Sequence, residues 1–323
     1  MTPFVPRPPW RNGDLQTLRN SIVRPIFDFK RWPGERMLLT MRDETGDRLA
    51  ASLHRPETAS AKPLVILVPG VTGCEESVYI KATATSLLKA GFPALRLNLR
   101  GSPPSRPTCR DHYHAGRSED LRDVVAALPQ SLKAHGLVVV GFSLGGNMAL
   151  KCLGEDGEAS PFLAAASISA PIDLFATTQQ FTSRRNKVYH QWMLNNLKKE
   201  ALMQGADVSP DEREAVIGAR TVIEYDDLYV ARRNGFDGAE DYYEKCQALT
   251  YLDAIRTPTL IIHADDDPWI PSDAYRRFKW ARNRWLRPEL TRAGGHVGFH
   301  ARGSKVPWHD QRILAFLDHV TPR

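Results

Sequence analysis

The chain has 323 residues, of which 42% are hydrophobic and 25% are charged, a balance typical of a globular protein with a sizeable core. Its 22 glycines and 23 prolines are near average numbers, which excludes collagen-like and long low-complexity chains. The formal net charge of +6 is too small for a dedicated nucleic-acid-binding protein.

Short apolar runs alternate with helical patterns along the chain. Two runs, at residues 37–41 and 48–53, flank the turn sequence 44–47 and predict a β-hairpin. Five further runs end at or near glycine, proline or aspartate, and such runs are typical of strands buried on both faces of a parallel sheet. They cover residues 63–68, 94–99, 137–140, 164–168 and 259–262.

Helical periodicity fills the spaces between these runs. Helices are expected over residues 77–89, 119–128, 144–153 and 313–320. A mostly parallel, doubly wound α/β sheet with a leading hairpin follows from this alternation. Residues 174–256 break the rhythm, with polar helices expected over 181–203 and 222–248. Such a long insertion predicts a helical lid within a single domain spanning 1–323.

Ser143 is the centre of a G-x-S-x-G motif, Gly141-Phe142-Ser143-Leu144-Gly145. The motif follows one expected strand and precedes an expected helix, which is the context of a nucleophile elbow. Glycines on both sides suit a tight, strained turn that leaves no room for Cβ atoms. An ordinary βα turn is the alternative interpretation. The sequence favours Ser143 as a nucleophile.

A serine hydroxyl is a weak nucleophile and needs a base that is itself oriented by an acid. After a nucleophile elbow the acid follows in the chain, and then the histidine. Among ten histidines, His296 lies on the glycine-rich turn Ala293-Gly294-Gly295-His296, just before the last helix, where the base is expected. His300 and His309 are rivals, which we expect to be surface or loop residues.

Three consecutive carboxylates (265–267) follow the last predicted buried strand, and they cannot all orient one imidazole. Asp267 is favoured because it begins a D-P-x-x-P sequence that is common in the loop after this strand. Asp266 remains an alternative, and so does Asp173, because some hydrolases carry the acid after the preceding strand.

An acyl transfer at Ser143 would need two backbone N–H donors for the charge that develops on the substrate oxygen. One is expected from Leu144, directly after the nucleophile. The other is expected from the loop 69–73, after the first buried strand, where Val71 is our choice. Loop position alone selects Val71, since its side chain plays no part in this role.

Taken together, these motifs resemble the YheT-like branch of the α/β-hydrolases, whose relatives include ABHD-type lipid esterases, over nearly the whole chain. The matching segments are Asn12–Thr17, Gly73–Ile80, Asn98–Gly101, Gly141–Asn147, Asp241–Tyr243 and Asp266–Pro268. The chain departs from the family with Pro69 and Asp14 in place of histidine and Cys246 in place of serine. The resemblance implies an α/β-hydrolase fold and a triad of Ser143, Asp267 and His296.

Basic residues alternate with aromatic ones over residues 275–292 and within 181–199. Such patterns occur at nucleic-acid and lipid surfaces, but over 275–292 they favour a surface helix with its aromatic side chains turned inward. The basic helices would allow weak contact with a membrane surface. His112 and His114 lack carboxylates at metal-site spacing, and no glycine loop matches a nucleotide fingerprint. We expect no nucleic acid, metal or cofactor.

Four widely spaced cysteines, none in a C-x-x-C pair, predict free thiols in a reducing compartment. The N-terminal residues lack the apolar core of a signal peptide, and the longest apolar stretch, 64–68, is far too short to span a membrane. A cytoplasmic location is expected from these features.

The expected activity is hydrolysis of carboxylic esters, small to medium or lipid-like, through an acyl-enzyme on Ser143. Acyl transfer to an alcohol would use the same three side chains and is an alternative. A non-catalytic binding protein with the same fold is a second alternative, against which the complete set of catalytic residue types argues.

Overall fold

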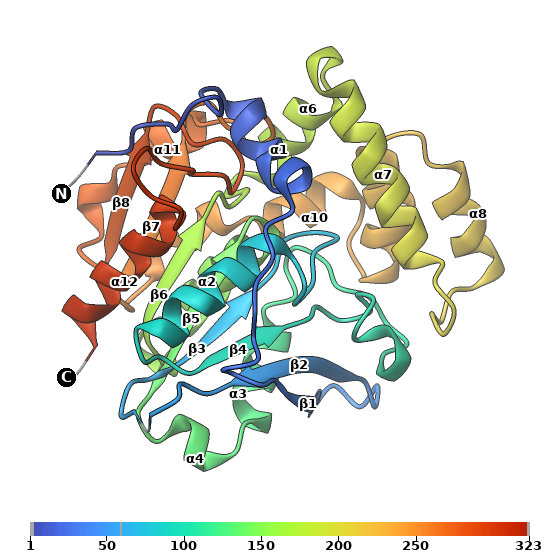
Figure 1. Ribbon diagram of the computed structural model, residues 1–323. Coiled ribbons are helices and arrows are strands. Elements are labelled where there is room, and N and C mark those ends of the chain that lie inside the picture. Colours follow the sequence, from blue (N-terminus) through green and yellow to red (C-terminus); the bar gives the residue numbers. More distant parts are fainter. Residues whose placement is uncertain (1–2, 59, 322–323) are drawn as a thin grey trace.

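The computed structural model describes residues 3–58 and 60–321 (Figure 1). A single sheet of eight strands runs through this part of the chain, in the order β1-β2-β4-β3-β5-β6-β7-β8. The strands are β1 (Glu35–Thr40), β2 (Arg48–His54), β3 (Leu64–Val68), β4 (Ala94–Leu97), β5 (Leu137–Phe142), β6 (Phe162–Ile168), β7 (Thr259–Ala264) and β8 (Leu286–Thr291).

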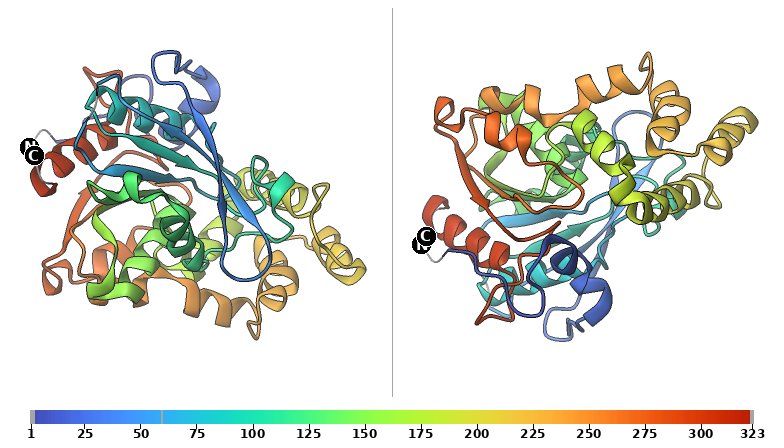
Figure 2. Two further views of the ribbon diagram at one scale, coloured as in Figure 1. Left: turned by 90° about the horizontal axis from the view of Figure 1, so that it is seen from below. Right: turned by 90° about the horizontal axis from the view of Figure 1, so that it is seen from above.

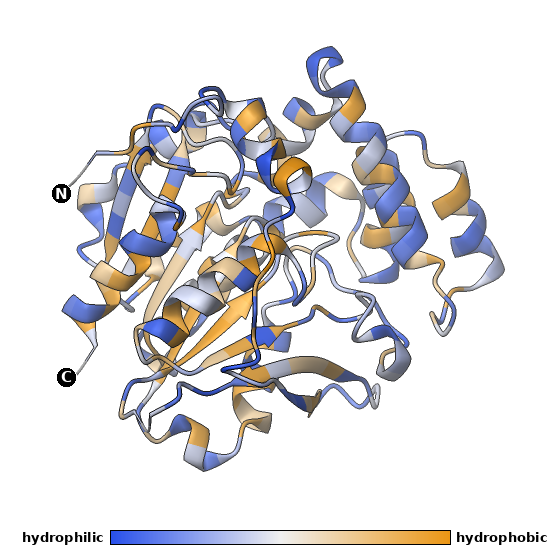
Figure 3. Ribbon diagram, in the orientation of Figure 1, coloured by the Kyte–Doolittle hydropathy of each residue, from blue (hydrophilic) through white to orange (hydrophobic). Residues whose placement is uncertain are grey.

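The predicted hairpin and the predicted parallel sheet are both confirmed. β1 and β2 pair antiparallel, and β2 is also antiparallel to β4. From β4 to β8 all neighbouring strands are parallel. Every residue of β3 and β5 is buried, which explains why both strands are uninterrupted apolar runs in the sequence (Figure 3).

Helices cover both faces of the sheet (Figure 2). Those outside the segment between β6 and β7 are α1 (Gly13–Val23), α2 (Val78–Lys89), α3 (Glu119–Ala127), α4 (Gln130–Lys133), α5 (Leu144–Asp156), α11 (Asp273–Arg277) and α12 (Trp308–Val320). α2 and α12 contact each other on one face of the sheet, whereas α3 and α5 contact each other on the opposite face. The doubly wound arrangement is therefore confirmed.

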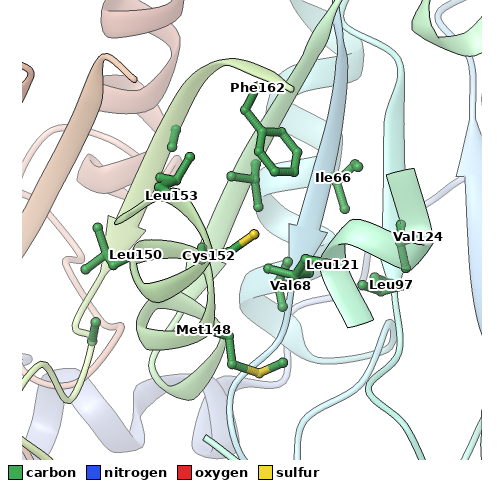
Figure 4. Packing of buried hydrophobic residues seen from close by; sticks show 14 of the residues in the cluster. Ile66, Val68, Leu97, Leu121, Val124, Met148, Leu150, Cys152, Leu153 and Phe162 are labelled. Carbon is green, nitrogen blue, oxygen red and sulfur yellow. The ribbon is translucent and has the colours of Figure 1, made fainter. Parts of the chain in front are cut away.

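Successive side chains of each strand supply the two cores alternately. Val65 and Leu67 of β3 belong to the cluster with α2 and α12. Ile66 and Val68 belong to the cluster with α3 and α5, which Figure 4 shows from close by. Each fully buried aliphatic side chain contributes about 1.5–3 kcal/mol, so the two cores hold the carboxyl ends of the strands in fixed positions.

The segment between β6 and β7, which we call the cap (residues 174–256), contains five α-helices and most of a third apolar cluster, which also includes Ala115. Its helices are α6 (Leu174–Thr182), α7 (Lys187–Ala201), α8 (Pro210–Gly218), α9 (Val222–Tyr225) and α10 (Ala239–Cys246). A π-helical stretch, Asp226–Ala231, follows α9. The assignment of this segment as a lid within a single domain spanning 1–323 stays a prediction.

Two segments differ from expectation. Residues 275–292 do not form one surface helix: α11 ends at Arg277, a short 3-10 turn follows, and β8 adds a strand at the sheet edge. Backbone pairing with β7 along β8 outweighs helix formation there. The second difference is α1, a helix in a proline-rich region for which none was predicted. Within the described ranges, no helix is long and apolar enough to cross a membrane.

Candidate active site

Ser143 occupies the sharp turn between β5 and α5, with φ 50° and ψ −122°. Positive φ is costly for a residue with a Cβ atom, so packing around the turn must hold it there. The flanking glycines show how tight this packing is. A Cβ atom on Gly141 would lie 2.3 Å from the Gly145 carbonyl oxygen, and one on Gly145 would lie 2.4 Å from the Pro69 carbonyl oxygen. The strained turn places the hydroxyl at the carboxyl end of β5, a central strand of the sheet.

His296 reaches Ser143 from the loop that follows β8. Its Nε2 lies 2.9 Å from the Ser143 Oγ, and both side chains are buried. The ring of Trp269 packs against the imidazole, with 4.4 Å between the ring centroids. The structure thus brings together the predicted nucleophile and the predicted base, which are 153 residues apart in the chain.

Asp267 lies on the other side of the imidazole. Its Oδ2 is 2.8 Å from His296 Nδ1, and its Oδ1 accepts hydrogen bonds from the backbone N–H groups of Trp269 and Ile270 at 2.8 and 3.0 Å. Burial by itself would raise the pKa of Asp267, but His296 and these donors hold that pKa below its ordinary value. The carboxylate is therefore ionised at neutral pH.

The alternative acids are engaged elsewhere. Asp266 Oδ1 accepts a hydrogen bond from the Gly295 N–H at 2.8 Å and so holds the loop after β8 that carries His296. Asp265 forms an ion pair with Arg276 at 3.0 Å. Asp173 caps α6, where it accepts from the Ala176 N–H at 2.9 Å. Only Asp267, among these four carboxylates, bonds to His296 in the structure.

The expected oxyanion donors lie beside Ser143. The loop 69–73 approaches so closely that a Cβ on Gly70 would lie 2.9 Å from the Ser143 Cβ. Within the described part of the chain, neither the Val71 N–H nor the Leu144 N–H forms a hydrogen bond with another protein group. Both donors are therefore free to bind an oxygen atom at the serine.

Two pockets meet at Ser143. The first, of about 830 Å³, is mainly apolar and extends under the cap; its lining includes Val71, Leu174, Phe181, Met193, Leu197 and Val230. The second, of about 1170 Å³, runs between α1 and α7; its lining includes Thr17, Asn20, Arg24, Ser77, Trp192 and Trp269. A substrate bound at the serine could place one end in each pocket.

Sequence reasoning missed the contribution of α1 to this site. The Thr17 hydroxyl accepts the His296 N–H at 2.8 Å, and the side chain of Gln16, fully buried, accepts from the His300 N–H at 2.7 Å. A Cβ on Gly13 would lie 1.8 Å from the Asp266 carbonyl oxygen, so α1 packs directly on the loop after β7 that carries Asp266 and Asp267. The N-G-x-x-Q-T match in the sequence was the available signal.

Of the two rival histidines, His300 lies in a loop, which is one of the expected settings, although it is only 6% exposed, whereas His309 lies in a helix and is 1% exposed, contrary to expectation. His309 lies in α12, where its ring packs edge-on against Phe142 and Phe299. Burial lowers the pKa of His300 to about 3, so this ring is neutral. Both are close to His296 along the chain, but of these three histidines only His296 bonds to Ser143 and Asp267 in the structure.

The sequence drew attention to His112 and His114 as possible metal ligands. Across residues 3–58 and 60–321, no group of three or more His, Cys, Asp or Glu side chains is arranged to hold a metal ion. His112 and His114 instead lie in the wall of the apolar pocket. Burial lowers the pKa of His112 to about 4, which leaves its ring neutral.

Comparisons with known proteins identify the family and the fold. Residues 65–306 match a family model described as "Alpha/beta hydrolase family". A protein of Escherichia coli (strain K12) named "Putative esterase YheT" is 31% identical over 97% of this chain and 92% of its own length. "Medium-chain fatty acid ethyl ester synthase/esterase 2" of Saccharomyces cerevisiae is 30% identical over 79% of this chain and 62% of its own. The esterase Pf2001 of Pyrococcus furiosus shares the fold, with a TM-score of 0.61 at 16% identity, over 92% of this chain and 98% of its own.

Proposed function

This chain belongs to the YheT-like branch of the alpha/beta hydrolase family and is a carboxylic ester hydrolase, and we propose that it works through an acyl-enzyme formed on Ser143. The observation that carries the proposal is the continuous hydrogen-bonded chain from Ser143 through His296 to Asp267. Serine, imidazole and carboxylate in this order are the requirements for acyl transfer through a serine ester.

In the first half of the reaction, His296 Nε2 takes the proton of Ser143 as the Oγ attacks the ester carbonyl. Asp267, ionised and hydrogen-bonded to Nδ1, orients the ring and stabilises the imidazolium that forms. The N–H groups of Val71 and Leu144 bind the oxyanion. His296 then donates its proton to the departing alcohol, which leaves Ser143 acylated.

In the second half, His296 takes a proton from water, and the resulting hydroxide equivalent attacks the acyl-enzyme carbonyl. The same N–H groups bind the second oxyanion, and the proton returns to Ser143 as the carboxylic acid departs. All groups needed for both halves lie within the described site, and no cofactor takes part in this scheme.

The two pockets suggest how an ester lies at the serine. The apolar pocket suits the acyl chain, because each methylene buried there contributes up to about 0.8 kcal/mol. The second pocket, with the hydroxyl, amide and guanidinium groups of Thr17, Asn20 and Arg24 in its lining, suits the alcohol part. We therefore assign medium-length or lipid-like acyl esters as substrates.

The second pocket also supports acyl transfer as an alternative. An alcohol held there would lie where water must otherwise attack, and it could take the acyl group from Ser143 through the same base. The yeast relative named as both a synthase and an esterase is consistent with this alternative. Product analysis with added ethanol distinguishes the two: an ethyl ester forms in proportion to the ethanol only if the alcohol competes with water.

The proposal is tested by Ser143→Ala, which we expect to lower kcat for p-nitrophenyl butanoate by about 10⁴ to 10⁶-fold. Ser167→Ala is a matched control, because Ser167 is also buried at the end of a neighbouring strand and its hydroxyl has no hydrogen-bond partner in the described structure. Retained activity in the Ser143 variant would refute the proposal.

A further inference from the structure

Tyr113 lies between the cap and the loop 69–73, which we call the oxyanion loop. Its ring is buried, and its hydroxyl accepts a hydrogen bond from the Thr72 N–H at 2.8 Å. The same hydroxyl donates to a carboxylate oxygen of Glu200, in the last turn of α7, also at 2.8 Å. Three segments that are distant in the sequence are thereby joined through one oxygen atom.

A second tyrosine holds the loop from the other side. The hydroxyl of Tyr79, in α2, accepts from the Gly70 N–H at 3.0 Å. The N–H groups on both sides of Val71 therefore donate to tyrosine oxygens, whereas the Val71 N–H has no protein partner in the described residues. Of these three consecutive N–H groups, that of Val71 is the one left for a ligand, and Val71 lines both pockets at the serine.

The loop conformation requires such support. Thr72 has φ 53°, in the left-handed region that a β-branched residue rarely adopts. A conformation of this kind costs on the order of 1–3 kcal/mol and persists only where surrounding contacts fix it. The hydrogen bond from Thr72 to Tyr113 is a contact of that kind, and it acts directly on the residue that follows Val71.

Glu200 carries a carboxyl group at a buried position, where desolvation of that group opposes folding. It is 6% exposed, and Tyr113 is the hydrogen-bond partner that the described structure gives its carboxyl group. Burying a carboxyl group is unfavourable, and an apolar side chain of the same shape would fill the space at less cost. Arg106 acts electrostatically on this carboxyl group, and the hydrogen bond that the group accepts orients the Tyr113 hydroxyl.

We propose that Tyr113 and Glu200 are positioning residues for the oxyanion hole, through which cap helix α7 sets the position of the Val71 N–H. Glu200 accepts a hydrogen bond from the Tyr113 hydroxyl. This bond fixes the direction of the O–H, so that a lone pair of the oxygen faces the Thr72 N–H. The proposal rests on the acyl-enzyme mechanism given above and adds two residues whose hydroxyl and carboxyl groups act on the reacting atoms through the loop 69–73 and not by direct contact.

The same helix lines the acyl pocket. Met193 and Leu197 of α7 form part of that wall, together with Tyr113 and Val71. An acyl chain packed against α7 thus presses on the element that holds the oxyanion loop. Acyl binding should therefore improve turnover as well as affinity.

The test uses Tyr113→Phe, which keeps the ring and removes the hydroxyl. We expect kcat for p-nitrophenyl butanoate to fall about 10- to 100-fold with KM nearly unchanged, since complete removal of one oxyanion donor costs roughly 10² to 10³ in kcat. Tyr229→Phe is the matched control: Tyr229, in the cap, is 2% exposed against 4% for Tyr113, but in the described structure it lines neither pocket and forms no hydrogen bond with the loop 69–73. Its kcat should match that of the unmodified protein.

Variants of Glu200 keep the test decisive if Tyr113→Phe folds poorly. Glu200→Leu should lower kcat as Tyr113→Phe does, whereas Glu200→Gln, whose amide oxygen still accepts from Tyr113, should recover most of that loss. Adding Glu200→Leu to Tyr113→Phe should cause little further loss of kcat, because both changes break the same chain of hydrogen bonds, from Glu200 through Tyr113 to Thr72. Thermal unfolding of each variant shows whether it is folded at the assay temperature.

The positioning proposal is overturned if folded Tyr113→Phe keeps kcat within twofold of the unmodified protein, or if Tyr229→Phe loses as much. Intact-mass measurement separates this failure from that of the mechanism itself. If the unmodified protein is acylated on Ser143 and folded Tyr113→Phe is acylated and turned over at the same rate, only the positioning role is wrong. An unmodified protein that is never acylated overturns both.

Discussion

Leu197→Ser should flatten the dependence of activity on acyl length, and Trp192→Ser should not. Both residues lie on α7, but Leu197 is buried in the wall of the apolar pocket, whereas Trp192 is half exposed and lines the second pocket. A serine at position 197 would bring a hydroxyl and water into the space where acyl methylenes bind. A serine at position 192 would leave that space intact.

The size of the effect follows from burial. At about 0.8 kcal/mol per methylene, kcat/KM rises up to about fourfold for each carbon added, or up to about 200-fold from butanoate to octanoate. Leu197→Ser should reduce this ratio to tens or less, whereas Trp192→Ser should leave it near the value of the unmodified protein. The assay is a series of p-nitrophenyl esters of increasing acyl length.

Stability needs a parallel measurement, because the loss of a buried leucine from the cap core costs about 2–5 kcal/mol. Thermal unfolding therefore defines a temperature at which both variants are folded. An unchanged ratio in Leu197→Ser, or an equal loss in Trp192→Ser, would refute the assignment of the apolar pocket to the acyl chain.

Three other predictions concern the acid, the loop that carries His296 and the cap. Asp267→Asn should lower kcat by up to about 10⁴-fold through the wrong imidazole tautomer, whereas Asp266→Asn should cost far less; a reversed order in steady-state kinetics would transfer the role to Asp266. Thr17→Val removes the acceptor of the His296 N–H and should lower kcat several-fold, because the histidine is then held less firmly. Full activity in steady-state kinetics would show that α1 does not position the base. Burial raises the pKa of Asp226 to about 7 from an ordinary 3.8, so between pH 4 and 7 the folded chain binds a proton that the unfolded chain releases. The free energy of unfolding should therefore fall as pH rises through this window, by up to about 1.4 kcal/mol per pH unit, and urea titrations of Asp226→Asn should show a smaller slope.

The core of the fold was predictable because its signals are local. β3 is a fully buried apolar run, so its bounds in the structure, Leu64–Val68, nearly coincide with those expected from sequence. Ser143 was recognisable because the elbow imposes glycine at nearby positions, and a Cβ there would overlap backbone atoms. Close backbone packing leaves a mark in composition that can be read without a structure.

Features that depend on tertiary contacts were harder to predict. α1 has a weak apolar pattern and is fixed by Gly13 against the loop after β7 and by buried Gln16, and neither contact has a periodic signal. Trp192 and Met193 are neighbours in the chain, but Trp192 lines only the second pocket whereas Met193 lines both, since successive helical residues point about 100° apart. Which side of α7 faces the serine depends on how the cap is docked.

The central claim, a covalent ester on Ser143, is tested most directly by mixing the protein with a p-nitrophenyl ester and following both products. We predict a burst of p-nitrophenol approaching one equivalent per chain under conditions of slow deacylation, with the acyl mass located by peptide mapping on Ser143. An acyl group on another residue, or ester turnover that persists in Ser143→Ala, would contradict the account.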